Sequence, residues 1–114
     1  MVYDTFMTTA TTFFIVAISG SMNPVMTPGQ VYEVTSDYEF SDLEVGDVIV
    51  FATPTNTDPE WQMASHRIVS IDEEEQTVDT LGDNNNGTQI EGVDLDIPKF
   101  NIKGILEGVR APPL

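Results

Sequence analysis

Residues 46–51 read Gly46-Asp47-Val48-Ile49-Val50-Phe51, a turn-forming pair followed by four apolar residues. A short apolar run that is rich in β-branched side chains and follows a turn predicts a buried strand. On its N-terminal side, Val31–Val34 alternates apolar and polar residues, which predicts a strand with one face in water. Farther back, Phe13–Ile18 is aromatic and β-branched and predicts another buried strand.

The segments after residue 51 continue the alternation of strands and turns. The predicted strands there are Trp61–Ile71, Thr77–Leu81 and Ile102–Val109. The predicted loops and turns are Thr53–Glu60, Asp72–Glu75 and Gly82–Gly87. Because many short strands are separated by turn signals, and no long window has a helical period, the sequence predicts an all-β domain with little helix. Such a domain is either barrel-like or built from packed antiparallel sheets.

The charge of the chain is strongly negative. Nineteen Asp and Glu residues face four Lys and Arg, which gives a formal net charge of −15 over 114 residues. A field of this sign repels phosphate backbones, so nucleic acid is excluded as an expected partner. Salt screens such self-repulsion, since the Debye length falls to about 3 Å at 1 M, and the composition therefore suggests a salt-adapted source.

The chain has no cysteine and a single histidine, His66. Disulfide scaffolds, cysteine nucleophiles, thiolate metal sites and multi-histidine zinc centres are therefore excluded, and we expect neither a metal nor a cofactor. If the protein is an enzyme, His66 is its only conventional base with a pKa near neutrality among the residue types present.

One domain of residues 13–114 is expected, after a short N-terminal segment of residues 1–12. The most apolar stretch, Thr5–Ile18, is shorter than the roughly 20 residues that a membrane-spanning helix needs.

Three short stretches place reactive side chains beside predicted strands. They are Ser19-Gly20-Ser21-Met22-Asn23-Pro24, Ser65-His66-Arg67-Ile68-Val69 and Gly82-Asp83-Asn84-Asn85. A serine nucleophile needs a neighbouring base, and the base needs an orienting partner, but these requirements are spatial and do not fix a sequence spacing. The residue types are therefore compatible with a catalytic triad without establishing one.

These stretches, with Gly46–Phe51 between the first two, resemble the conserved boxes of type I signal peptidases in their residues and in their order. The strand around Gly104 is similar to the closing segment of that family, so the resemblance covers roughly residues 13–110. His66 stands where the bacterial branch has a lysine, as in the archaeal and endoplasmic-reticulum branch. Together with the acidic composition, this favours a halophilic archaeon or one of its viruses as the source.

The resemblance implies a serine endopeptidase that removes N-terminal signal peptides from secreted preproteins. Ser21 is then the nucleophile and His66 the general base, while the Ser21 N–H and the Ser19 hydroxyl hold the oxyanion. It also implies activity at the extracytoplasmic face of a membrane. Because family members normally carry a spanning helix before the serine box, the membrane surface or a membrane partner is expected to anchor this chain.

The third member of the triad is less well defined by the sequence. The family often carries a second aspartate six residues after that of its Gly-Asp-Asn-Asn box, and Gln89 occupies that position here. Asp83 is therefore the preferred orienting carboxylate, with Asp94 as the substitute if the loop is longer. Asp83 is also compatible with a purely structural role in the turn.

A second hypothesis is a catalytically inactive β domain that binds extended peptides by strand addition. Gln89 and the lack of a full anchor favour it. The distance between the Ser21 hydroxyl and the His66 ring distinguishes the two hypotheses, because a general base must lie within hydrogen-bond reach of its nucleophile.

Overall fold

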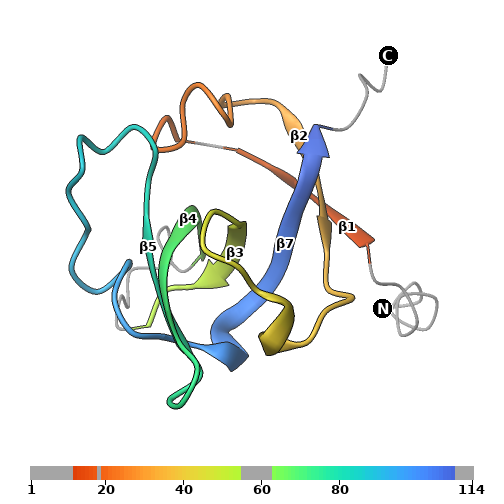
Figure 1. Cartoon of the computed structure of the whole chain (residues 1–114). Coiled ribbons are helices and arrows are strands. Elements are labelled where there is room, and N and C mark those ends of the chain that lie inside the picture. Colours follow the sequence, from red (N-terminus) through yellow and green to blue (C-terminus); the bar gives the residue numbers. More distant parts are fainter. Residues whose placement is uncertain (1–11, 18, 55–62, 110–114) are drawn as a thin grey trace.

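The computed structural model describes residues 12–17, 19–54 and 63–109. Within these ranges, seven strands form one antiparallel sheet in the order β1-β2-β7-β3-β4-β5-β6 (Figure 1). The strands are β1 Thr12–Val16, β2 Val31–Thr35, β3 Val48–Ala52, β4 Met63–Asp72, β5 Thr77–Leu81, β6 Ile97–Pro98 and β7 Ile102–Val109. Two single-turn 3₁₀ helices complete the described elements: η1 Phe40–Asp42 and η3 Lys99–Asn101. The all-β prediction is confirmed, and the strands form one curved sheet rather than two packed sheets.

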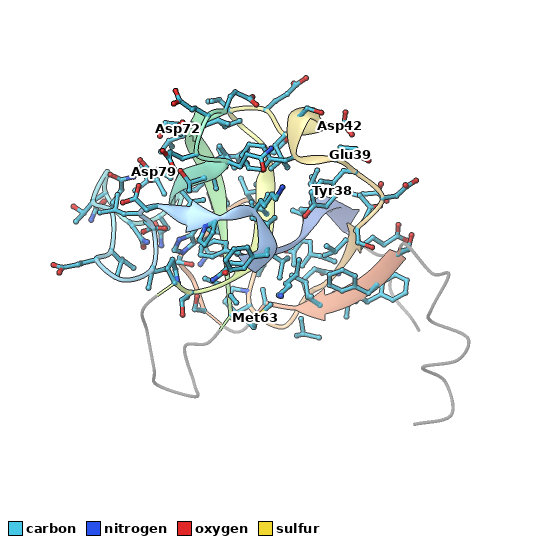
Figure 2. The ribbon with its side chains drawn as sticks, turned by 90° about the horizontal axis from the view of Figure 1, so that it is seen from below. Tyr38, Glu39, Asp42, Met63, Asp72 and Asp79 are labelled. Carbon is cyan, nitrogen blue, oxygen red and sulfur yellow. The ribbon has the colours of Figure 1, made fainter. Side chains whose placement is uncertain are left out.

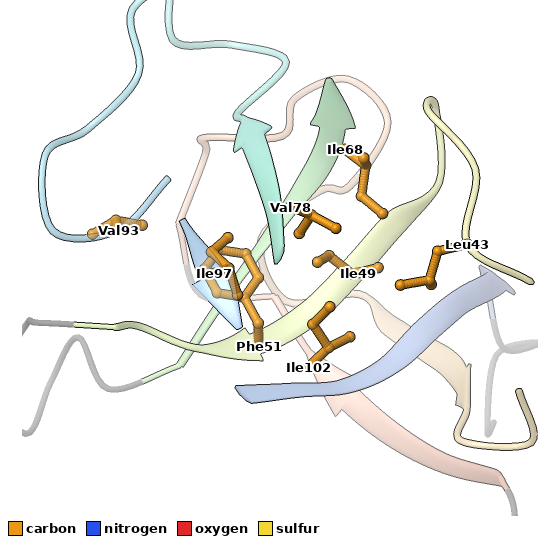
Figure 3. Close-up of a cluster of buried hydrophobic side chains, with 8 residues drawn as sticks. All are labelled: Leu43, Ile49, Phe51, Ile68, Val78, Val93, Ile97 and Ile102. Atoms are coloured by element: carbon orange, nitrogen blue, oxygen red, sulfur yellow. The ribbon is translucent and has the colours of Figure 1, made fainter. Parts of the chain in front are cut away.

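The central strand β3 is buried, as its unbroken apolar run predicts, and the structure shows that both of its faces are covered. Ile49 and Phe51 point into the larger core, with aliphatic side chains from β4, β5, β6 and β7 around them (Figure 3). Val48 points to the other face and packs in a second, smaller core against Met22, Met26 and Tyr32. Since successive side chains of a strand point to opposite faces, a strand between two cores must be apolar at every position.

The strand predicted over Phe13–Ile18 is present as β1, but its predicted burial is wrong. β1 lies at one end of the sheet order and pairs with β2, and Phe14 and Val16 are 47% and 53% exposed. The composition of this segment indicated a strand without revealing that it occupies an edge.

The other predicted strands agree closely with the structure. β5 and β7 have the predicted bounds, and a turn over residues 73–76 joins β4 to β5. The predicted half-exposure of β2 is confirmed by its alternating burial. Residues 1–11 of the predicted N-terminal segment, residues 55–60 of the predicted loop, and Trp61 lie outside the described residues. No helix of the described ranges is long and apolar enough to cross a membrane.

Gly104 allows β7 to lie close to its neighbours. A Cβ atom at this position would be 2.8 Å from the Thr35 carbonyl oxygen and in contact with a methyl group of Val34. A side chain is therefore excluded where β7 passes between β2 and β3.

Phe51→Ala is expected to lower the free energy of unfolding by about 3–5 kcal/mol, because it leaves a cavity in the larger core. Phe51 is fully buried, whereas Phe100 is 75% exposed. The matched variant Phe100→Ala should therefore stay within about 0.5 kcal/mol of the wild type. Urea unfolding followed by circular dichroism measures both, and equal losses would contradict this description of the core.

Candidate active site

The loop after β1 presents Ser21 at the end of β5. In Figure 1 this orange loop meets the cyan segment that leaves β5. The Asn84 N–H donates to the Ser21 carbonyl at 2.7 Å, and the Asn84 side-chain amide donates to the Gly20 carbonyl at 3.0 Å. Asn84 thus links the backbone of Gly20 and Ser21 to the Gly82–Asn85 loop.

The two loops approach closely because Gly82 lacks a side chain. A Cβ atom on Gly82 would lie 2.9 Å from the Ser21 carbonyl oxygen. In addition, the Met22 sulfur accepts a hydrogen bond from the Asp83 N–H at 3.2 Å, and Met22 is buried in the smaller core. The serine loop is therefore anchored by packing as well as by the bonds from Asn84.

β4 places His66 in the interior. His66 pairs with Ile49 of β3, and directly opposed residues of an antiparallel ladder point to the same face. Its ring lies edge-on to Phe51 at a centroid distance of 6.2 Å, and only 4% of the residue is exposed. The imidazole is consequently held by the larger core.

Ser21 and His66 lie within hydrogen-bond distance, as the sequence-based hypothesis requires. The distance from Ser21 Oγ to His66 Nε2 is 3.2 Å. Ser19 Oγ lies 3.2 Å from Ser21 Oγ and accepts a long bond of 3.4 Å from the Ser21 N–H. The predicted nucleophile, base and oxyanion donors therefore form one cluster.

The carboxylate on the other side of the imidazole belongs to Asp94. His66 Nδ1 lies 2.6 Å from Asp94 Oδ1, and Asp94 is fully buried. Thr80 Oγ1 donates to the same oxygen at 2.6 Å, and the Ile90 N–H donates to Oδ2 at 2.7 Å. An imidazole whose Nδ1–H donates to this carboxylate has Nε2 free to accept the Ser21 proton.

These bonds keep Asp94 ionised despite its burial. Burial alone raises the pKa of the Asp94 carboxyl, but the hydrogen bonds from His66, Thr80 and the Ile90 N–H outweigh it, so the pKa lies below its ordinary value. A negative charge therefore stands beside the imidazole at neutral pH.

The sequence-based preference for Asp83 over Asp94 as the carboxylate beside His66 is wrong, because Asp94 lies there and Asp83 binds Arg67. Asp83 accepts two hydrogen bonds from Arg67, one from Nε at 2.9 Å and one from Nη2 at 2.7 Å. The Arg67 hydrogen bond lowers the pKa of the Asp83 carboxyl. Since Arg67 and His66 are consecutive on β4, they point to opposite faces, and the carboxylate bound to one does not reach the other.

The sequence offered Asp94 only as the substitute for Asp83. It lies in the run Val93-Asp94-Leu95-Asp96-Ile97, where Val93 and Ile97 are buried in the larger core. Strict alternation would place Asp94 on the face opposite to these two residues, so no periodic pattern marked it as a buried partner. Thr80 and the Ile90 N–H were not identified from the sequence, because both act on Asp94 and neither belongs to a recognisable motif.

The Gln89 side chain is bound to the main chain of β5. Its side-chain amide donates to the Thr80 carbonyl at 3.0 Å. The glutamine at the position of the family's second aspartate therefore binds the backbone of β5, and Asp94, five residues later, occupies the place beside His66.

A cleft of about 830 Å³ opens beside Ser21 and His66. Apolar side chains from β1, β3, β4 and the loops line most of it, among them Ile15, Ala17, Met26, Val50, Met63 and Val93. None of its described lining residues is Asp, Glu, Lys or Arg, although the chain carries nineteen acidic residues. The cleft therefore fits an uncharged, apolar ligand.

The acidic side chains lie elsewhere on the molecule. Figure 2 shows Asp42 and Asp72 on the side opposite to Met63, which is half exposed at the cleft. Within the described ranges, no three His, Asp or Glu side chains are grouped so as to hold a metal ion.

Asp94→Asn is expected to change how stability depends on pH. Because the folded pKa of Asp94 lies below its ordinary value of 3.8, the unfolded chain takes up this proton first as the pH falls. The stabilisation is present above that ordinary value and is lost as the pH falls toward the folded pKa. Between about pH 5 and pH 3, the variant should therefore gain stability relative to the wild type.

Urea unfolding at several pH values measures this difference, and Asp37→Asn, at an exposed carboxylate, is the control. Parallel stability curves for Asp94→Asn and the wild type would contradict the inferred ionisation.

In comparisons with known proteins, no protein-family model matches the chain and no curated protein is significantly similar to it.

Proposed function

We propose that the protein is a serine endopeptidase of the signal peptidase kind, with Ser21 as nucleophile, His66 as general base and Asp94 as the orienting carboxylate. The observation that carries the proposal is the continuous chain of contacts from Ser21 Oγ through the imidazole to Asp94, at 3.2 and 2.6 Å. Nucleophile, base and orienting group in this order are the requirement for activating a serine hydroxyl.

The arrangement supports acyl transfer in two steps. Ser21 Oγ attacks the carbonyl carbon of the scissile bond while its proton passes to His66 Nε2. The tetrahedral intermediate collapses, the C–N bond breaks, and the proton moves from Nε2 to the leaving amine. A water molecule, deprotonated by His66, then attacks the ester and restores the Ser21 hydroxyl. Asp94 stabilises the imidazolium that forms in each step.

Ser19 and the Ser21 N–H are the proposed oxyanion donors. The bond between the Ser21 N–H and Ser19 Oγ is long, at 3.4 Å, so the N–H can exchange this partner for a developing oxyanion at little cost. The Ser19 hydroxyl, 3.2 Å from the nucleophile, can rotate to donate to the same oxygen. Loss of one such donor typically lowers the rate by about 10²–10³-fold.

The β4 segment beside Ser21 supports an extended peptide as substrate. β5 pairs with β4 from Arg67 onward, so over Met63–Ser65 the only described strand partner of β4 is β3. These residues also line the cleft. A peptide added along this edge gains main-chain hydrogen bonds and presents alternate side chains to the apolar cleft.

The proposed substrates are the signal peptides of secreted preproteins, with small uncharged side chains before the cut. The uncharged lining of the cleft supports this choice. The proposed location is the extracytoplasmic face of a membrane, held there by the membrane surface or by a membrane partner.

The distance between Ser21 and His66 favours the peptidase over the catalytically inactive domain. A domain that only binds peptides does not need a serine, an imidazole and a buried carboxylate in line. Burying Asp94 carries a desolvation cost that a purely binding function does not explain.

Ser21→Ala and His66→Ala are each expected to lower kcat by about 10⁴-fold or more, because each removes a group that makes or moves the reacting bond. Cleavage of a preprotein with small residues before its processing site, assayed in high salt, measures the effect. Ser70→Ala, which removes an exposed β4 hydroxyl that donates to Asp79 Oδ2 and does not line the cleft, is the matched control and should retain most activity.

A fluorophosphonate probe gives a second measurement that does not depend on the choice of preprotein. It should label Ser21 in the wild type and leave Ser21→Ala unlabelled. Equal labelling of the two proteins, or full cleavage by either triad variant, would refute the mechanism.

Asp94→Asn and Asp83→Asn should separate the two carboxylates that the sequence left open. Asp94→Asn is expected to reduce kcat by about 10⁴-fold, since an amide favours the wrong imidazole tautomer. Asp83→Asn weakens the pairing with Arg67 and should reduce kcat by no more than about tenfold. Steady-state kinetics of both variants decide the assignment, and the reverse order of losses would show that Asp83 acts on His66 during catalysis.

A further inference from the structure

We infer that Thr80 is a positioning residue for the proposed reaction: its hydroxyl fixes the Asp94 carboxylate in the orientation that holds His66 toward Ser21. This inference rests on the proposed function and adds to it a fourth side chain.

Thr80 is placed on the same face of the sheet as the imidazole. On β5 it pairs with Ile68, which lies two residues after His66 on β4, and residues two apart on a strand share a face. Thr80 is fully buried, and its Oγ1 lies 2.6 Å from Asp94 Oδ1. The Thr80 hydroxyl and the His66 imidazole therefore both donate to the same carboxylate oxygen, Asp94 Oδ1.

The backbone of Thr80 reinforces this placement. The Thr80 N–H donates to the Asp94 carbonyl at 2.8 Å, and the Thr80 carbonyl accepts the Gln89 amide. Asp94 belongs to the long segment between β5 and β6, so these bonds locate its main chain while the hydroxyl locates its carboxylate. A valine at position 80 retains the backbone bonds and the approximate volume, and removes only the donor.

The orientation of the Asp94 carboxylate matters because it holds the ring through Nδ1, whereas the proposed proton acceptor is Nε2, on the other side of the ring. The Ile90 N–H holds Oδ2, and Thr80 and His66 share Oδ1. Without the Thr80 hydroxyl, the group can rotate about its Cβ–Cγ bond, and the imidazole loses its fixed direction toward Ser21. Small displacements of this kind reduce catalysis more than substrate binding.

The test compares Thr80→Val with Thr80→Ser. Thr80→Val should lower kcat by about 10–100-fold and leave KM within about threefold, because a small misplacement of a group that supports the reacting atoms can cost up to about 10²-fold. Thr80→Ser keeps the hydroxyl and loses a buried methyl group, so its kcat should stay within about threefold of the wild type although its melting temperature falls. All assays are made at a temperature where unfolding curves show each variant folded.

The low-field NMR resonance of the His66 Nδ1 proton provides a readout that does not require cleavage. It should move or broaden in Thr80→Val and remain in place in Thr80→Ser. An unchanged kcat and resonance in Thr80→Val, or equal losses of kcat in both variants, would overturn the role of the hydroxyl. If the wild type neither cleaves a preprotein nor reacts with the fluorophosphonate, the proposed peptidase fails, while the resonance still decides whether Thr80 positions Asp94.

Discussion

The buried hydrogen bond between His66 Nδ1 and Asp94 is the interaction on which the site depends. A carboxylate removed from water is stable as an anion only when donors replace its hydration, and here the donors are the imidazole, the Thr80 hydroxyl and the Ile90 N–H. Loss of one partner from such a buried pair typically costs about 3–5 kcal/mol, because the remaining charge is left uncompensated. The same bonds that make Asp94 tolerable in the core also fix the tautomer and direction of the ring.

Two separate loops must meet near β4 to bring Ser21 to the imidazole that Asp94 holds. Asn84 binds the backbone of Gly20 and Ser21, and the Met22 side chain, in the same loop, packs in the smaller core. On the opposite face of β4, Arg67 binds Asp83 and the Gly46 carbonyl. The Gly-Asp-Asn-Asn stretch is thus chiefly a structural connector: its aspartate secures the loop and its first asparagine positions the serine backbone.

Much of the fold was accessible from local patterns. The apolar run of β3, the alternation in β2 and the acidic turn between β4 and β5 each reflect a short-range rule of periodicity or turn chemistry, and these elements agree with the structure. The burial of β1 was mispredicted, because edge position depends on which strands pair, a property of the whole sheet. Ser21 and His66 were also identifiable, since each lies in a stretch whose wording resembles a known family.

The sequence by itself determined that the chain is an all-β domain with a single histidine, His66, and that Ser21 and His66 lie in short stretches beside strands. Only the tertiary structure decided which carboxylate faces that imidazole. Asp83 is nearer to His66 in sequence and lies in the more recognisable motif, yet it binds Arg67, whose side chain points to the opposite face of β4 from His66. Asp94 reaches His66 because β5 holds its backbone and side chain through Thr80, and such a long-range contact leaves no periodic trace in the chain.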